Sequence, residues 1–215
     1  MDYKIYSFAT DDLDPDVLLW QRRVFDKFGL SFEQVVLPKN PDYNIWSDKG
    51  GCFWHNDHSY FLQNTLRSTQ TEYVVFFDVD CIPITDTCLP TLLDQIKDKN
   101  TLAGAVQSNH DFGIYMSAYF VGFATQLYFD CGAPSTTIMD IDPFVEFTKE
   151  CSKRSKSIKY WYPSSSRCGE WKILNTDLKY GKGTTFENMV YHEFQIRRTD
   201  TSNFIEKCKW VINNG

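Results

Sequence analysis

Apolar segments of two kinds alternate along the first half of the chain. Short runs of aromatic and β-branched residues that end at proline or a polar turn predict strands, at 4–9, 33–37, 73–77 and 102–106. Between them, apolar residues at helical spacing predict helices, from Pro15, across 56–68, and from Thr85 or Asp86 to about Lys97. The run 73–77 is apolar at every position, which is typical of a strand covered on both faces. This order predicts an α/β fold with a central, mainly parallel but mixed sheet flanked by helices.

The second half of the chain has a less regular pattern. Residues 115–124 are aromatic and apolar, 143–153 resemble a helix, and 159–162 and 189–196 resemble short strands. We interpret Gly181-Lys182-Gly183 as a turn before the last of these strands. Mixed or antiparallel pairing is therefore expected at this end of the sheet.

Composition and charge narrow the range of partners. The net charge of −6 argues against a protein that follows nucleic-acid phosphates, which normally presents a basic face. No apolar stretch approaches the ~20 residues of a membrane-spanning helix, and no signal peptide is recognisable. Seven scattered cysteines without a Cys-x-x-Cys pair indicate reduced thiols, as in a cytosolic protein. The tail Asn213-Asn214-Gly215 would also fit one domain of a longer polypeptide.

Two aspartates, Asp78 and Asp80, directly follow the apolar run 73–77. In open α/β sheets, ligands bind beyond the carboxyl ends of the strands. Side chains at i and i+2 of an extended chain point the same way, so both carboxylates can reach one cation while Val79 faces elsewhere. Mg²⁺ and Mn²⁺ take oxygen ligands and often share their coordination sphere with substrate phosphates. The pair therefore predicts a divalent cation that holds a diphosphate.

Other interpretations of this aspartate pair stay open. Aspartate is common in turns after strands, so the pair can be structural. Haloacid-dehalogenase-type phosphohydrolases place Asp-x-Asp in the same context and use the first aspartate, here Asp78, as nucleophile. Their motif continues with threonine two residues later, where this chain has Ile82. A non-catalytic module that binds nucleotide sugars or glycans is a third interpretation, suggested by the aromatic share of 16%.

With His192 late in the chain, in the segment 190–194, the arrangement resembles the metal-dependent glycosyltransferases of the GT-A fold. Members of this family have Asp-x-Asp after a central strand and often use a late histidine as a further metal ligand. The resemblance therefore implies that Asp78, Asp80 and His192 hold the metal. It spans nearly the whole chain, although its motifs are short.

The resemblance also implies an organisation and an activity. It implies a single domain, 1–215, with a nucleotide-binding half, 1–108, and an acceptor half, 109–215. More narrowly, the chain is similar to glycosyltransferases of chlorella-infecting viruses that build capsid glycans. This implies transfer of a hexose or deoxyhexose from a UDP-sugar to a glycan acceptor, with Mn²⁺ or Mg²⁺, in the host cytoplasm. We expect retention at the anomeric carbon, and the inverting alternative, which needs a carboxylate base, stays open.

Position by position, the resemblance implies further contacts to the donor, by Phe8, Ala9, Thr10, Asp11, Asp57, Val79 and Lys182. The residues after the first strand would hold uracil and ribose, Val79 would approach ribose through its backbone, and Lys182 would reach the diphosphate. Glu170 falls where relatives have a catalytic carboxylate or amide, and Asp140 and Asp142 compete for this role.

Each of these assignments has a structural alternative. Residues 10–12 can cap the following helix, Lys182 can be a solvated turn lysine, and His192 can be a hydrogen-bonded core histidine. The aromatic residues Trp161, Tyr162, Trp171 and those of 115–128 can form either an acceptor wall or core.

Overall fold

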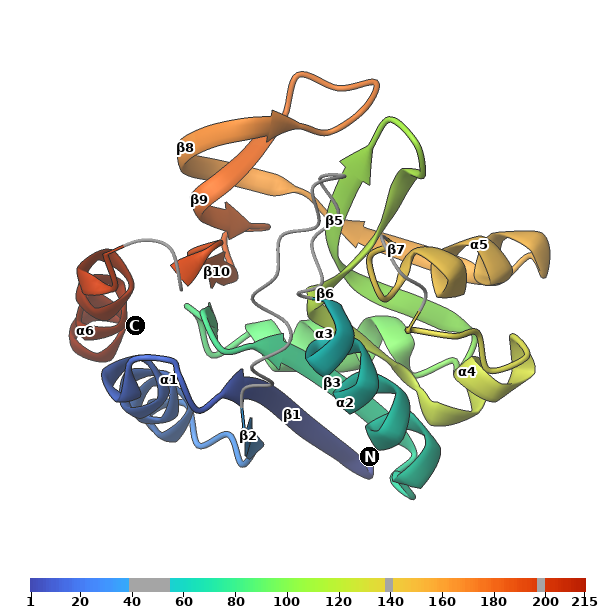
Figure 1. Ribbon diagram of the computed structural model, residues 1–215, viewed down its shortest axis with the longest axis horizontal. Helices are drawn as coiled ribbons and strands as arrows, with labels where there is room; N and C mark the ends of the chain where they lie inside the picture. Colours follow the sequence, from blue (N-terminus) through green and yellow to red (C-terminus); the bar gives the residue numbers. More distant parts are fainter. Residues whose placement is uncertain (39–54, 138–140, 197–199) are drawn as a thin grey trace.

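The chain folds around a six-stranded sheet (Figure 1). The computed structural model describes residues 1–38, 55–137, 141–196 and 200–215, and only the backbone of 55–57. In spatial order the strands are β2 (Glu33–Leu37), β1 (Tyr3–Thr10), β3 (Tyr73–Asp78), β6 (Gly113–Ala124), β5 (Thr101–Asn109) and β7 (Ser157–Trp161). Strand β6 is antiparallel to both of its neighbours, and the other pairs are parallel. The predicted α/β fold with a mixed, mostly parallel sheet is thus confirmed.

Helices cover both faces of this sheet. They are α1 (Pro15–Lys27), α2 (His55–Ser68), α3 (Cys88–Ile96), α4 (Thr125–Asp130), α5 (Val145–Lys153) and α6 (Ser202–Asn214). Successive strand residues point to opposite faces, and Phe76 and Phe77 of β3 accordingly pack against different helices. Phe76 contacts Phe61 of α2, and Phe77 contacts Phe25 of α1, with ring centroids 6.5 and 5.1 Å apart. An apolar run without alternation is what such a doubly covered strand requires.

The neighbouring strand β6 is likewise covered on both faces, by α3 and α5. Gly122 faces α3 so closely that a Cβ atom there would lie 2.7 Å from Cδ2 of Leu92. On the other face, the ring of Phe123 lies 4.9 Å from that of Phe147 in α5. The glycine therefore lets α3 approach the sheet, while aromatic rings fill the opposite side.

A second, smaller sheet carries the late part of the chain. Its strands, in spatial order, are β4 (Cys81–Pro83), β10 (Val190–His192), β9 (Lys179–Phe186) and β8 (Pro163–Lys172). All pairs are antiparallel, and β10 places His192 opposite Cys81 on one side and Thr184 on the other. In Figure 1, β8 and β9 form a hairpin at the top, away from α1 and α6. The small sheet thus brings a late segment beside the residue that follows Asp80.

Helices α1 and α6 lie side by side at the edge of the molecule (Figure 1). A second apolar cluster lies beneath them and includes Phe204 and Val211 of α6. Val79 is 4% exposed and belongs to this cluster. Its side chain therefore points away from the two aspartates, as the alternation along the strand predicted.

The differences from the predicted elements concern mainly the second half. Residues 181–183 are not a turn but lie inside β9, and the neighbouring strand explains their glycines. A Cβ atom on Gly181 would lie 2.1 Å from the carbonyl oxygen of Cys168 in β8. Helix α3 begins at Cys88 without a side-chain cap, later than predicted. Strands β4, β8 and β9 and helices α4 and α6 were not predicted.

Cys81, Cys88, Cys131, Cys151, Cys168 and Cys208 are free thiols. Within the described part of the chain, every helix is too short or too polar to cross a lipid bilayer.

Candidate metal and nucleotide site

Asp78, Asp80 and His192 come together at the carboxyl end of β3. One ligand atom from each side chain lies within 4.8 Å of the others. Nε2 of His192 is 3.0 Å from Oδ1 of Asp80. Asp80 and His192 are buried, whereas the side chain of Asp78 is 28% exposed and leaves the group open on one side. Two carboxylates and an imidazole are a donor set that suits a divalent cation.

Aromatic neighbours fix the imidazole of His192. Its ring stacks on Tyr119, with centroids 4.2 Å apart and planes at 25°, and lies 3.9 Å from the ring of Phe194. Its Nδ1 atom is buried and has no hydrogen-bond partner among the described residues. Buried polar atoms without a partner are rare and costly. This argues against a fully hydrogen-bonded core histidine and fits a side chain with bonding capacity left for a ligand.

The electrostatics around Asp80 favour a carboxylate. Burial raises the pKa of the Asp80 carboxyl, but the adjacent His192 and backbone N–H groups, including that of Ile196, outweigh burial and lower this pKa. The side chain is therefore ionised near neutral pH. A buried, ionised carboxylate is the form that binds a cation.

Gln21 of α1 holds the loop that carries the two aspartates. Its side chain is fully buried, and its Nε2 donates to the carbonyl oxygens of Asp78, at 2.7 Å, and Cys81, at 3.1 Å. Its Oε1 accepts from the Ser7 hydroxyl and the Gln34 amide, each at 3.0 Å. A buried amide with four bonds fixes the backbone on both sides of Asp80. Gln21 was not predicted from the sequence, where a polar residue among the apolar positions of α1 was the available indication.

The segment Phe8, Ala9, Thr10 and Asp11 lies beside this loop. Phe8 is opposite Asp78 in the pairing of β1 with β3. Phe8, Ala9 and Thr10 are buried and Asp11 is exposed. The cap of α1 is Asp14, whose carboxylate accepts from the Asp16 N–H, so the alternative that residues 10–12 cap this helix is wrong. Their contact with a nucleotide stays a prediction.

His58 of α2 joins the predicted nucleotide loop to the predicted metal site. Its ring stacks on Phe8, with centroids 5.4 Å apart, and its Nε2 lies 4.0 Å from Oδ1 of Asp78. His58 was not predicted from the sequence. Its neighbour Asp57 was predicted to contact the nucleotide, and the side chain of Asp57 lies outside the described residues. The spacing of His58 and Phe61 on one face of α2 was the available indication.

Lys182 and Glu170 lie together on the β8–β9 hairpin. Nζ of Lys182 is 3.6 Å from Oε1 of Glu170, and the same Oε1 lies 3.7 Å from the Cys168 thiol. Strand β10 separates this hairpin from β4. The structure thus brings the two predicted residues to each other, and their roles in binding or catalysis stay predictions.

Asp142 is the alternative to Glu170 that the structure describes, and its carboxyl interacts electrostatically with the candidate metal ligand Asp78. Burial raises the pKa of its carboxyl to about 7; the Phe144 N–H partly offsets this, and the charge of Asp78 adds to it. The Asp142 charge in turn helps raise the pKa of Tyr115 and Tyr180. Asp140 lies outside the described residues.

Only part of the predicted aromatic wall is accessible. Trp161 is 1% exposed and packs on Phe120, so it belongs to the core. Trp171 is partly exposed and contacts Tyr180 and Phe194, with ring centroids 5.5 and 5.6 Å away. Trp171 is therefore the predicted tryptophan that both reaches the surface and adjoins the aromatic residues around His192.

The protein is similar to known proteins in structure. No protein-family model and no curated protein matches the sequence. The galactosyltransferase LgtC, in complex with donor and acceptor sugar analogues, is 10% identical; the match covers 95% of this chain and 95% of that chain, with a TM-score of 0.50. At this identity the likeness shows the fold, which is GT-A-like.

Two further structures are more distant. Drosophila β1,4-galactosyltransferase 7, a mutant in complex with manganese, UDP-Gal and xylobiose, is 10% identical over 92% of this chain and 75% of that chain, with a TM-score of 0.49. A glycosyltransferase involved in glycosylation of the major capsid of PBCV-1 is 9% identical over 60% of this chain and 66% of that chain, with a TM-score of 0.37. The narrower resemblance to a chlorella-virus enzyme is not confirmed at this similarity.

Proposed function

We propose that the protein is a glycosyltransferase that moves a hexose or deoxyhexose from a UDP-sugar to a glycan acceptor. Asp78, Asp80 and His192 would hold Mn²⁺ or Mg²⁺. The convergence of these three side chains within 4.8 Å at the carboxyl end of β3, in a GT-A-like fold, carries the proposal. The role in viral glycan synthesis and the cytoplasmic location rest on the sequence resemblance alone and are kept as proposals.

The donor would lie between β1 and the aspartate loop. A bound divalent cation would supply charge neutralisation for the departing diphosphate, typically several kcal/mol of transition-state stabilisation. Asp78 and Asp80 supply the carboxylates for this cation, and His192 supplies the imidazole. Gln21 keeps the backbone of the loop in place, so that the ligand atoms are positioned before the donor arrives.

The acceptor would approach from the side of Asp142. Its carboxyl, with a pKa of about 7, is partly protonated and partly ionised at neutral pH, so it can accept a hydrogen bond from the attacking hydroxyl. We propose retention, in which the leaving phosphate takes the acceptor proton and Asp142 orients the hydroxyl. If Asp142 were instead the base, the product would have the inverted anomeric configuration.

Thermal unfolding with candidate ligands tests the proposal. A ligand that binds only the native state raises its stability by RT ln(1 + [L]/Kd). We expect UDP with Mn²⁺ to raise the melting temperature more than GDP or CMP with Mn²⁺, and EDTA to abolish the effect. Stabilisation by beryllofluoride but not by UDP would favour a phosphohydrolase that uses Asp78 as nucleophile. Binding of UDP-sugars without turnover by any acceptor would favour a non-catalytic module.

A further inference from the structure

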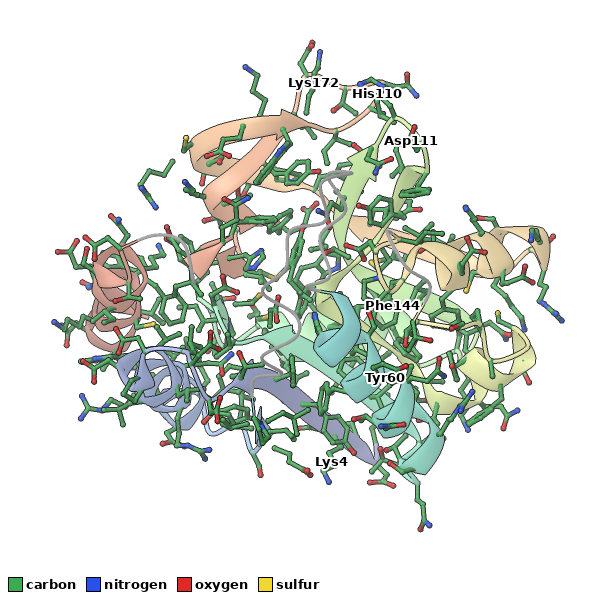
Figure 2. The ribbon with its side chains drawn as sticks, viewed as in Figure 1. Lys4, Tyr60, His110, Asp111, Phe144 and Lys172 are labelled. Carbon is green, nitrogen blue, oxygen red and sulfur yellow. The ribbon has the colours of Figure 1, made fainter. Side chains whose placement is uncertain are left out.

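A separate cavity opens between the tips of two hairpins. Its volume is about 590 Å³, within the usual range for small-ligand sites. The β5–β6 turn contributes Asn109 and His110, and the β8–β9 hairpin contributes Glu170, Trp171 and Asn175. Figure 2 shows His110 and Lys172, which both line this cavity, at the ends of the two hairpins. Nothing in the proposed donor site uses this space.

Hydrogen bonds tie the two walls of the cavity together. The Ser108 hydroxyl donates to the carbonyl oxygen of Lys172, at 3.1 Å, and accepts from the Leu174 N–H, at 3.0 Å. The hydroxyl of Tyr180 donates to the carbonyl oxygen of Ser108, at 3.0 Å. These bonds join β5 to the β8–β9 hairpin from both strands of that hairpin. The cavity is therefore preformed, which lowers the entropy cost of binding.

A short series of aromatic contacts connects the cavity with the candidate metal site. Trp171 lines the cavity and lies 5.6 Å from Phe194, which in turn lies 3.9 Å from His192, measured between ring centroids. A ligand on Trp171 would thus be two aromatic rings away from the imidazole. This separation suits a glycan of which one sugar unit reacts at the metal site while a further unit lies on Trp171.

The lining has the chemistry of a site for an uncharged sugar. Trp171 offers a partly exposed ring for the apolar face of a pyranose. Neither the His110 imidazole nor the Asn175 amide hydrogen-bonds to another described side chain, so both are available to hydroxyl groups. Both lining carboxylates are paired with a lysine, Asp177 with Lys172 at 2.9 Å and Glu170 with Lys182 at 3.6 Å. Because no unpaired lysine or arginine is left among the described lining residues, the cavity offers no counter-charge for uronic acids or phosphorylated sugars.

We propose that this cavity is a subsite for an uncharged sugar unit of the acceptor glycan, next to the unit that receives the transferred sugar. The proposal rests on the proposed function in one respect, that the glycan bound here is an acceptor. Recognition of the sugar itself needs neither metal nor donor. The two proposals therefore make separable predictions.

The test uses the wild-type chain labelled with 5-fluorotryptophan and followed by ¹⁹F NMR, without nucleotide or metal. A Trp171→Phe variant assigns the Trp171 signal, and Trp210, which is 50% exposed on α6, serves as an internal control. The probes are neutral trisaccharides of glucose, galactose, mannose, xylose, rhamnose and N-acetylglucosamine, and trigalacturonate, at millimolar concentration. We expect at least one neutral probe to shift the Trp171 signal while Trp210 stays unchanged and trigalacturonate has no effect.

Several outcomes would overturn the proposal. These are the absence of a Trp171 shift with every neutral trisaccharide, an equal shift of Trp210, and an equal shift with trigalacturonate. A Trp171→Leu variant, with Trp210→Leu as control, should lose at least tenfold in affinity for the active probe by calorimetry. UDP with Mn²⁺ is titrated separately: a sugar response without UDP binding would sustain the subsite and contradict the transferase, and the reverse result would contradict the subsite alone.

Discussion

Nε2 of His192 lies 3.0 Å from Oδ1 of Asp80, although the two residues are 112 positions apart in the chain. The pairing of β10 with β4 brings them together, because it sets His192 opposite Cys81, the residue after Asp80. Sheet hydrogen bonds thus hold His192 beside the turn that carries Asp80. Because the ligand atoms are already in place in the folded protein, a substitution of one ligand can remove metal binding without unfolding the protein.

Asp78→Asn should remove metal-dependent function while the fold persists. Asp78 is partly exposed, so the substitution leaves no deeply buried charge unpaired. If the cation contributes several kcal/mol, turnover should fall by about a hundredfold or more. The measurement is the thermal shift with UDP and Mn²⁺, together with UDP release from UDP-sugars. The control is Asp94→Asn on α3, where the exposed carboxylate pairs with Lys97. Full activity of Asp78→Asn would contradict the metal assignment.

Gln21→Leu should weaken both the fold and the metal site. The substitution removes four hydrogen bonds and leaves the carbonyl oxygens of Asp78 and Cys81 without this partner. We expect a loss of about 3 kcal/mol in the free energy of unfolding. Urea denaturation measures this loss, and Mn²⁺ titration measures the accompanying loss of affinity.

The matched control is Gln126→Leu on α4. Its amide makes one exposed hydrogen bond, to Asp130 at 2.9 Å. This change should alter the free energy of unfolding by no more than about 0.5 kcal/mol. Equal effects of the two substitutions would show that Gln21 has no special role in holding the aspartate loop.

The apolar strands of the first half could be predicted from the sequence, whereas the role of Gln21 could not. The strands of the first half were predictable because burial on both faces requires continuous apolar runs, such as 73–77. Strand β8 was not, because it is exposed along most of its length and its Ser-rich segment has no apolar alternation. Helix α6 did show helical spacing, at Phe204, Cys208 and Val211, and was overlooked.

The candidate site divides in the same way. Asp78 and Asp80 are neighbours in sequence, so alternation along an extended strand was enough to predict that they act together. His192 needed a family resemblance, because its proximity depends on the pairing of β10 with β4. The contacts of His58 and Gln21 depend on how helices pack on the sheet, which no local pattern specifies.

Asp142→Asn should stabilise the metal-free protein, and more so at higher pH. Burial raises the pKa of the Asp142 carboxyl to about 7, above the value of about 3.9 for an unfolded chain. Between these pH values the folded state binds more protons than the unfolded state, so wild-type stability falls as pH rises from about 4 to about 7. Asparagine cannot ionise and avoids this loss.

Thermal unfolding in EDTA measures this effect. The melting temperature of Asp142→Asn minus that of the wild type should rise with pH up to about 7 and then level off. The control is Asp177→Asn, because hydrogen bonding to Lys172 lowers the pKa of Asp177. Its effect on stability therefore changes with pH only below about pH 4, and the difference in melting temperature should stay constant from about pH 4 to about pH 7. A difference for Asp142→Asn that does not depend on pH would contradict a raised pKa.

The roles of Asp142 and Glu170 can be separated by their effects on transfer. Asp142 interacts electrostatically with Asp78, whereas Glu170 pairs with Lys182 on the outer hairpin. Asp142→Asn should therefore lower kcat by about a hundredfold, which is typical for the loss of a group that transfers a proton or positions a hydroxyl.

Glu170→Gln should keep kcat within about threefold. It should raise the KM of a trisaccharide acceptor more than that of a monosaccharide, because Glu170 lines the separate cavity. Initial rates of UDP release and NMR of the anomeric proton of the product provide the measurements. A large loss of kcat in Glu170→Gln with normal kcat in Asp142→Asn would show that Glu170, and not Asp142, is the catalytic carboxylate. A product with inverted anomeric configuration would show that the catalytic carboxylate acts as a base.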